Sequence, residues 1–150
     1  MIEVKSEEEM QRLGERLGRL FRGGEVVELI GDVGAGKTTF VRGVARGMGV
    51  SEVVQSPSFT INRVYDADDD RRLVHYDFYR LQDAGIMANE LAEAVDDDKT
   101  SVVVEWADAV ERVLPVDRLS ISITSPAETV RQLILRGGGE TSNRLVRELQ

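Results

Sequence analysis

A short glycine-rich segment, IGDVGAGKTTF at residues 30–40, has the residue types and spacing needed to bind phosphate. It fits the pattern G-x-x-x-x-G-K-[ST], which begins at Gly31 and ends with Lys37 and Thr38. Glycines allow the backbone to curl until successive N–H groups point at one anion, beside the positive end of the following helix. Lys37 is then expected to contact the outer phosphates of a nucleotide, and the Thr38 hydroxyl is expected to contact Mg²⁺.

The predicted nucleotide contacts extend over the whole loop and into a second segment. QSPSFT, at residues 55–60, follows the helix after the loop, where nucleotide switches sense the γ-phosphate; a simple Ser-Pro turn is the alternative. The sequence has no N-K-x-D guanine signature, so ATP is favoured over GTP. The predicted nucleotide-binding residues are Gly31, Asp32, Val33, Gly34, Ala35, Gly36, Lys37, Thr38, Thr39, Ser56 and Thr60.

Two acidic residues, Asp77 and Glu105, each follow an apolar run that is expected to form a strand. Mg²⁺ requires oxygen ligands besides the Thr38 hydroxyl and the phosphates, and a carboxylate at the end of a buried strand is the usual source. At least one of the two acids is therefore predicted to serve the metal. Spacing leaves open which acid binds the ion and which orients the attacking water. The alternative role of either residue alone is a helix cap or a solvated strand end.

Three further side chains lie close in sequence to these acids. His75, the only histidine, precedes Asp77 by two positions and shares its face of a strand. We expect His75 to pack or hydrogen-bond near the active site, with catalysis as the alternative. Arg80 is a candidate contact of the γ-phosphate or a loop clamp, and a surface salt bridge is its alternative role. Trp106 is expected to pack in the core, or else to hold the orientation of Glu105.

Alternating strands and helices are predicted to position these residues. SEEEMQRLGERLGRLFRGG is expected to form an amphipathic helix with a capping box at Ser6 and Glu9. The segment between residues 61 and 81 resembles two strands around an acidic turn, and hence a β-hairpin. The other predicted strands cover residues 25–30, 101–106, 118–124 and 129–137. One further helix is predicted directly after the glycine loop, and three more cover residues 84–95, 107–114 and 141–150. The last helix is expected to have Thr141 or Ser142 as its cap.

This order of elements predicts a layered α/β fold with a mostly parallel central sheet and an antiparallel hairpin. Ligands of such sheets bind at the carboxyl ends of the strands, where the glycine loop lies. A single domain spanning residues 1–150 is expected from the length of the chain.

Composition restricts the class of protein and its partners. A formal net charge of −8 argues against a protein that binds nucleic acid on its own, because such binding needs clustered Lys and Arg. No apolar run approaches the roughly 20 residues of a membrane span. The sequence contains no cysteine and no signal-peptide pattern, which fits a cytoplasmic protein.

Four motifs, in this order, resemble those of the TsaE (YjeE) family, the small P-loop ATPases of bacterial tRNA threonylcarbamoyladenosine synthesis. They are GDVGAGKTTF, then SPSFT against the family's S-P-T-[FY]-T, then HYDFYRL against its H-x-D-L-Y-R, and finally VEW. Together they span residues 31–106. Ser58 replaces the family's Thr, and Met10 stands where the family often has Thr near the adenine.

The resemblance implies a three-layer P-loop NTPase fold and a Mg²⁺-dependent ATPase that is weak alone and needs partner proteins. It assigns phosphate binding to residues 31–38, the magnesium site to Thr38 and Glu105, and a function in the hydrolytic site to Asp77. It also implies that residues 56–60 act as a switch. By the same resemblance, the partners are TsaD and TsaB, which transfer threonylcarbamoyl to adenosine and contact the tRNA.

Two other functions are compatible with the phosphate-binding pattern. A small-molecule kinase would need an acceptor pocket and a basic lid over the phosphates, and no clear lid is found in the sequence. A nucleotide-gated binding module would bind ATP with negligible turnover.

Overall fold

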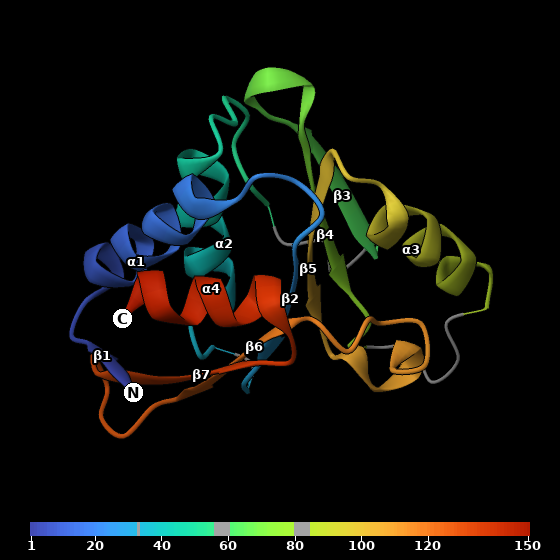
Figure 1. The fold of residues 1–150 in the computed structure, drawn as a ribbon. Helices are drawn as coiled ribbons and strands as arrows, with labels where there is room; N and C mark the ends of the chain where they lie inside the picture. Colours follow the sequence, from blue (N-terminus) through green and yellow to red (C-terminus); the bar gives the residue numbers. More distant parts are fainter. Residues whose placement is uncertain (33, 56–60, 80–84) are drawn as a thin grey trace.

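The computed structural model describes residues 1–32, 34–55, 61–79 and 85–150, and Figure 1 shows its arrangement. None of the helices within these ranges is long and apolar enough to cross a membrane. The elements are β1 (Ile2–Val4), α1 (Glu7–Leu20), β2 (Val26–Ile30), α2 (Lys37–Gly47), β3 (Asn62–Asp66), the 3₁₀ turn η1 (Asp68–Asp70), β4 (Arg72–Asp77), α3 (Ile86–Asp96), β5 (Thr100–Glu105), the 3₁₀ turn η2 (Ala107–Val110), β6 (Leu119–Thr124), β7 (Arg131–Gly137) and α4 (Glu140–Leu149).

The strands form one sheet in the order β1-β7-β6-β2-β5-β4-β3. Its centre, β6-β2-β5-β4, is parallel, whereas β3 pairs with β4, and β7 with β6 and β1, in antiparallel fashion. The predicted α/β fold with a parallel centre and an antiparallel hairpin is therefore confirmed. The antiparallel part is larger than predicted, because β1 was not expected and completes the edge beyond β7.

Helices cover both faces of the sheet, which creates three layers (Figure 1). α1, α2 and α4 lie on one face over a large core that includes Leu17, Phe40 and Leu133. α3 and η2 lie on the other face over a smaller core that includes Tyr76 and Leu91. Every residue of β5 is buried, as expected for a strand that is covered on both faces.

Two predicted local features are wrong. Residues 107–114 were expected to form a helix, but only the short turn η2 forms, directly after Trp106, whose backbone is left-handed with φ 56°. The cap of the last helix is also different, because Gly139 is the N-cap. Asp117, from a separate loop, accepts the N–H groups of Thr141 at 3.1 Å and Ser142 at 2.9 Å.

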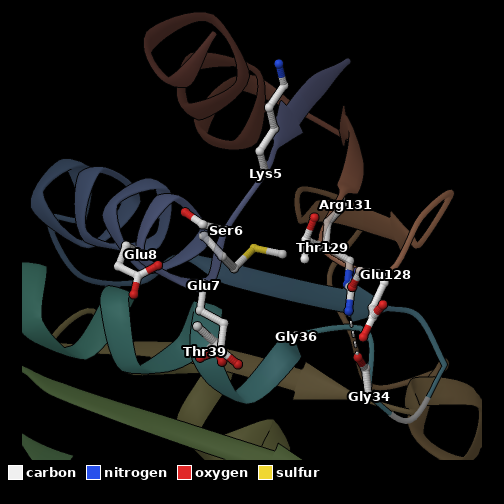
Figure 2. Close-up of a pocket in the computed structure, with 11 residues that line it drawn as sticks. Lys5, Ser6, Glu7, Glu8, Gly34, Gly36, Thr39, Glu128, Thr129 and Arg131 are labelled. Carbon is white, nitrogen blue, oxygen red and sulfur yellow. Dashed lines mark hydrogen bonds between the residues drawn. The ribbon is translucent and has the colours of Figure 1, made fainter.

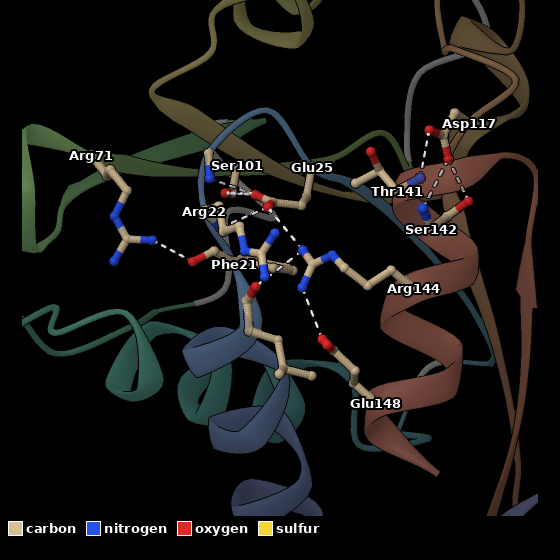
Figure 3. Close-up of polar contacts among 12 residues, drawn as sticks. Phe21, Arg22, Glu25, Arg71, Ser101, Asp117, Thr141, Ser142, Arg144 and Glu148 are labelled. Carbon is tan, nitrogen blue, oxygen red and sulfur yellow. Dashed lines mark hydrogen bonds and ion pairs between the residues drawn. The ribbon is translucent and has the colours of Figure 1, made fainter.

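The carboxyl group of Asp117 is stabilised in its ionised form by this helix start (Figure 3). Partial burial by itself would raise its pKa, but the Ser142 hydroxyl and the two N–H groups outweigh that effect. The pKa of Asp117 is therefore lowered. A sequence pattern within the helix could not indicate this cap, because the acceptor comes from 24 residues away.

α1 and α2 pack in very close contact through glycines on both helices. A Cβ added at Gly14 would lie 2.2 Å from Phe40 O, and one at Gly18 would lie 2.1 Å from Val44 O. Gly43 and Gly47 of α2 approach the backbone of α1 in the same way. Glycine is less favourable than alanine inside a helix, so these positions are explained by the close contact between the two helix backbones, which leaves no room for a Cβ atom. The start of α1 consequently lies beside the glycine loop and the start of β7 (Figure 2).

A buried carboxylate, Glu25, joins four parts of the fold just before β2 (Figure 3). It accepts the N–H groups of Arg22 at 2.6 Å and Gly23 at 2.9 Å, and the Ser101 hydroxyl at 2.7 Å. Arg144 of α4 lies 3.8 Å from the same carboxylate. Glu25 thus ties the end of α1, the start of β5 and α4 to the start of β2.

Gly18→Ala tests the close helix contact. Helix propensity alone would stabilise the protein by about 1 kcal/mol, but the clash with Val44 should cost more, so we expect a net loss of roughly 1–3 kcal/mol. Urea unfolding measures the change. Arg12→Ala, exposed on the same helix, is the control and should change stability by less than about 0.5 kcal/mol. A Gly18→Ala variant more stable than the natural chain would contradict the proposed contact.

Glu25→Ala should lower the free energy of unfolding by about 3 kcal/mol or more, because it leaves buried donors without an acceptor and removes the buried one of the two carboxylates beside Arg144. Chemical denaturation at neutral pH is the measurement. Glu148 contacts the same Arg144 at 2.9 Å with a side chain that is 42% exposed. Glu148→Ala is therefore the matched control, with an expected loss below about 1 kcal/mol. Equal losses of unfolding free energy in Glu25→Ala and Glu148→Ala would show that the buried contacts of Glu25 contribute no additional stability.

Candidate functional site

The loop between β2 and α2 has the backbone shape of an anion-binding turn. Gly34 and Gly36 adopt φ angles of 85° and 98°, which disfavour residues with a side chain. Within α2, Phe40 donates its N–H to Gly36 O at 3.0 Å, whereas the N–H groups of residues 37–39 have no backbone acceptor among the described residues. N–H groups without a backbone acceptor at a helix start are what a phosphate group requires.

Lys37, the first residue of α2, is buried at 6% exposure. Its ammonium donates a hydrogen bond to Gly31 O at 2.6 Å and lies 3.6 Å from Oε1 of Glu105. It also lies 4.4 Å from the centre of the Trp106 ring, as in a cation–π contact. The loop, the strand end and the aromatic ring therefore converge on one buried cation.

The parallel sheet brings the two predicted acids together. Glu105 ends β5 and is opposite Leu29 of β2 on one side and Asp77 of β4 on the other. Both carboxylates are buried, at 4% exposure for Glu105 and 9% for Asp77. Asp77 Oδ1 accepts the N–H of Tyr79 at 2.9 Å. Glu105 is thus the acid that faces Lys37, and Asp77 lies beside it on the next strand.

His75 is fully buried and orients Glu105. Its Nε2 lies 2.5 Å from Oε2 of Glu105, so the two carboxylate oxygens have different partners, His75 and Lys37. Nε2 carries the proton of this hydrogen bond when Glu105 is ionised. Nδ1 of His75 is buried and has no hydrogen-bond partner among the described residues. The geometry therefore gives His75 a hydrogen-bonding role at the site.

Trp106 reaches this site because the chain turns sharply after Glu105. Its φ of 56° is in the left-handed region, which is unusual for a large side chain and costs roughly 1–3 kcal/mol. The Trp106 ring lies over the Lys37 ammonium, and its centre is 4.8 Å from that of Tyr79, a half-exposed residue. Backbone strain at this point accordingly places an aromatic side chain beside the buried cation.

A pocket of about 400 Å³ adjoins the glycine loop (Figure 2). Gly34, Gly36 and Thr39 form its side toward the loop, Met10 of α1 contributes another wall, and Arg131 of β7 a third. A Cβ at Gly36 would lie 3.3 Å from Met10 Cε, so glycine keeps this side of the pocket open. Its volume falls within the usual range for small-molecule sites, about 300–1,000 Å³.

The structure places some of the predicted site residues together, whereas others lie outside the described residues. Lys37, Glu105 and Asp77 come together, and Thr38 and Thr39 occupy the first turn of α2. Four predicted residues, Val33, Ser56, Thr60 and Arg80, lie outside the described residues. Arg131 and Tyr79 were not singled out from the sequence, because only the folded chain brings them to the glycine loop and to Trp106.

Comparisons with known proteins agree on one family. A family model described as "Threonylcarbamoyl adenosine biosynthesis protein TsaE" matches residues 4–133. The tRNA threonylcarbamoyladenosine biosynthesis protein TsaE of Streptomyces coelicolor is 40% identical over 136 residues, which cover 87% of this chain and 92% of that protein. The protein of the same name from Bacillus subtilis is 34% identical over 143 residues, which cover 95% of this chain and 88% of that protein.

A solved structure shares the whole architecture. The crystal structure of Bacillus subtilis YdiB superposes with a TM-score of 0.80 at 31% sequence identity, covering 99% of this chain and 91% of that one. The resemblance seen in the motifs is thereby confirmed over nearly the full length. The chain belongs to the TsaE family of threonylcarbamoyl adenosine biosynthesis proteins.

Proposed function

We propose that this protein binds ATP and Mg²⁺ and hydrolyses the ATP, as the ATPase subunit of the assembly that makes threonylcarbamoyladenosine in tRNA. One observation carries the proposal: the buried Lys37 ammonium lies between the carbonyl of Gly31 and the carboxylate of Glu105. A lysine held there can exchange the Gly31 carbonyl for a phosphate oxygen without leaving the glycine loop. Its charge then neutralises the outer phosphates.

The described residues fit a metal-bound nucleotide. Glycines at positions 34 and 36 leave room for an anion beside the N–H groups of α2, and Thr38 and Glu105 supply oxygen donors of the kind that Mg²⁺ prefers. No group of three or more His, Asp or Glu side chains gathers within the described ranges, in keeping with an ion held partly by phosphate oxygens. Bound Mg²⁺ would supply charge neutralisation at the phosphates.

Each acid then has a separate role. Glu105, oriented by His75, presents Oε1 toward the cation and the phosphate side of the site, which suits the metal or its waters. Asp77 lies on the adjacent strand and is the candidate for orienting the attacking water. The pocket between Met10 and Arg131 has the position and volume to hold the base and ribose.

In this proposal, TsaD and TsaB carry out the transfer of threonylcarbamoyl to the tRNA. We propose that the nucleotide state of this protein acts on the TsaD–TsaB complex, with hydrolysis supporting repeated turnover. A net charge of −8 supports leaving tRNA contacts to those partners. For such control, the ATP-bound and ADP-bound forms must differ in affinity for the complex.

ADP production from ATP and Mg²⁺ by the purified chain, alone and with TsaD and TsaB, tests the function. Weak turnover that rises with the partners is the expected result. ADP formation that depends on a small-molecule acceptor would favour a kinase instead. Bound ATP without turnover in either condition would favour a nucleotide-gated binding module.

Lys37→Ala should weaken ATP binding by roughly 100-fold, because truncating one member of a buried charge pair costs about 2–5 kcal/mol and each 1.4 kcal/mol is tenfold. Isothermal titration calorimetry with Mg²⁺ present measures the affinity. Lys99→Ala removes an exposed lysine and serves as the control. Unchanged affinity in the Lys37 variant would refute phosphate binding at this loop.

Glu105→Gln keeps the size of the side chain but removes its charge. We expect Mg²⁺-dependent turnover to fall by about 100-fold or more, a larger effect than the loss of stability from leaving Lys37 without its carboxylate partner. Turnover is measured in the presence of the partners. Glu111→Gln, at a side chain that is 56% exposed, is the control. A collapse in thermal stability with unaltered turnover per folded molecule would exclude the proposed role.

A further inference from the structure

Arg131, the first residue of β7, links two loops that are far apart in the sequence. Its Nε donates to Ala35 O at 3.2 Å. One terminal nitrogen lies 3.5 Å from Gly34 O, and Figure 2 shows this contact. The other terminal nitrogen lies 3.0–3.1 Å from three carbonyl oxygens of the β6–β7 connection, those of Ala127, Glu128 and Val130. One planar guanidinium therefore contacts both the glycine loop and the neighbouring connection.

These contacts determine the direction of the loop peptides. The C=O and N–H of a trans peptide point in opposite directions. Because the carbonyls of Gly34 and Ala35 are directed at Arg131, the N–H groups of Ala35 and Gly36 point away from it. That of Ala35 donates to Asp32 O at 3.0 Å within the loop. That of Gly36 has no backbone acceptor among the described residues.

The Arg131 side chain, and the paired strand β7 that carries it, are suited to holding two loops together. Arginine presents five N–H donors in a rigid plane, whereas the single ammonium of lysine cannot reach both loops in the same way. β7 is held on both sides, since it pairs with β6 and, through Arg131 opposite Val4, with β1. A residue on a paired strand is a firmer anchor than a residue on a loop.

We infer that Arg131 is a positioning residue for phosphate binding: it fixes the peptides of Gly34 and Ala35 so that the N–H group of Gly36 faces the anion. This inference rests on the proposed nucleotide binding and adds a residue from the C-terminal third of the chain to that site. Arg131 acts through the loop backbone and needs no contact with the phosphates.

Two measurements on Arg131→Gln and Arg131→Lys test the inference. The first is the ¹⁵N order parameter of the Gly36 amide without ligand, which should fall from the rigid range, about 0.85, to below about 0.6 in both variants. The second is the Kd for ATP with Mg²⁺ by calorimetry, which should rise about tenfold or more in both. Arg136→Gln, exposed on the same strand, is the matched control and should leave both quantities unchanged.

The outcomes separate the inference from the proposed function. An unaltered order parameter and Kd in Arg131→Gln would overturn the positioning role. Natural affinity in Arg131→Lys would also overturn it, because charge alone would then suffice. If the natural chain binds no ATP, the proposed function fails, and the order parameters still decide whether Arg131 fixes the loop.

Discussion

The parallel pairing of β2 with β5 is the constraint on which the site depends. β2 leads into the glycine loop and β5 ends at Glu105, so their register decides whether the carboxylate meets the Lys37 ammonium. At the opposite end of the pair, Glu25 accepts the Ser101 hydroxyl and two N–H groups from the turn after α1. A shift of one residue would place Glu105 on the other face of the sheet. A buried carboxylate at one end of the sheet thus supports the chemistry at the other.

Close packing of α1 on α2 is the second support. Four glycines allow the two helix backbones to pack in direct contact. The start of α1 therefore lies beside the glycine loop, and Met10 lines the pocket there. α2 carries Lys37 and Thr38 at its first turn, so its position against α1 also sets the position of these two side chains. The same packing therefore holds the helix that we propose binds phosphate, and it forms a wall of the pocket beside that helix.

The charges at the site are balanced before any nucleotide arrives. Lys37 has a carbonyl, a carboxylate and an aromatic ring around it, and Glu105 has Lys37 and His75. A buried charge without such partners would be strongly unfavourable. In the proposed function, phosphate binding is an exchange of partners around a lysine that is already in place, which keeps reorganisation small.

The local features could be predicted from the sequence alone: the glycine loop with its Lys-Thr pair, the strands of the parallel centre, the hairpin, and acids at the ends of two strands. They follow from spacing within short segments, where side-chain periodicity and backbone conformation act. Four contacts became visible only in the folded chain: Lys37 faces Glu105 rather than Asp77, His75 bonds Glu105, Asp117 caps α4, and Arg131 contacts the glycine loop. Each of these contacts joins segments distant in the chain, and strand register and helix packing, which no local pattern encodes, bring them together.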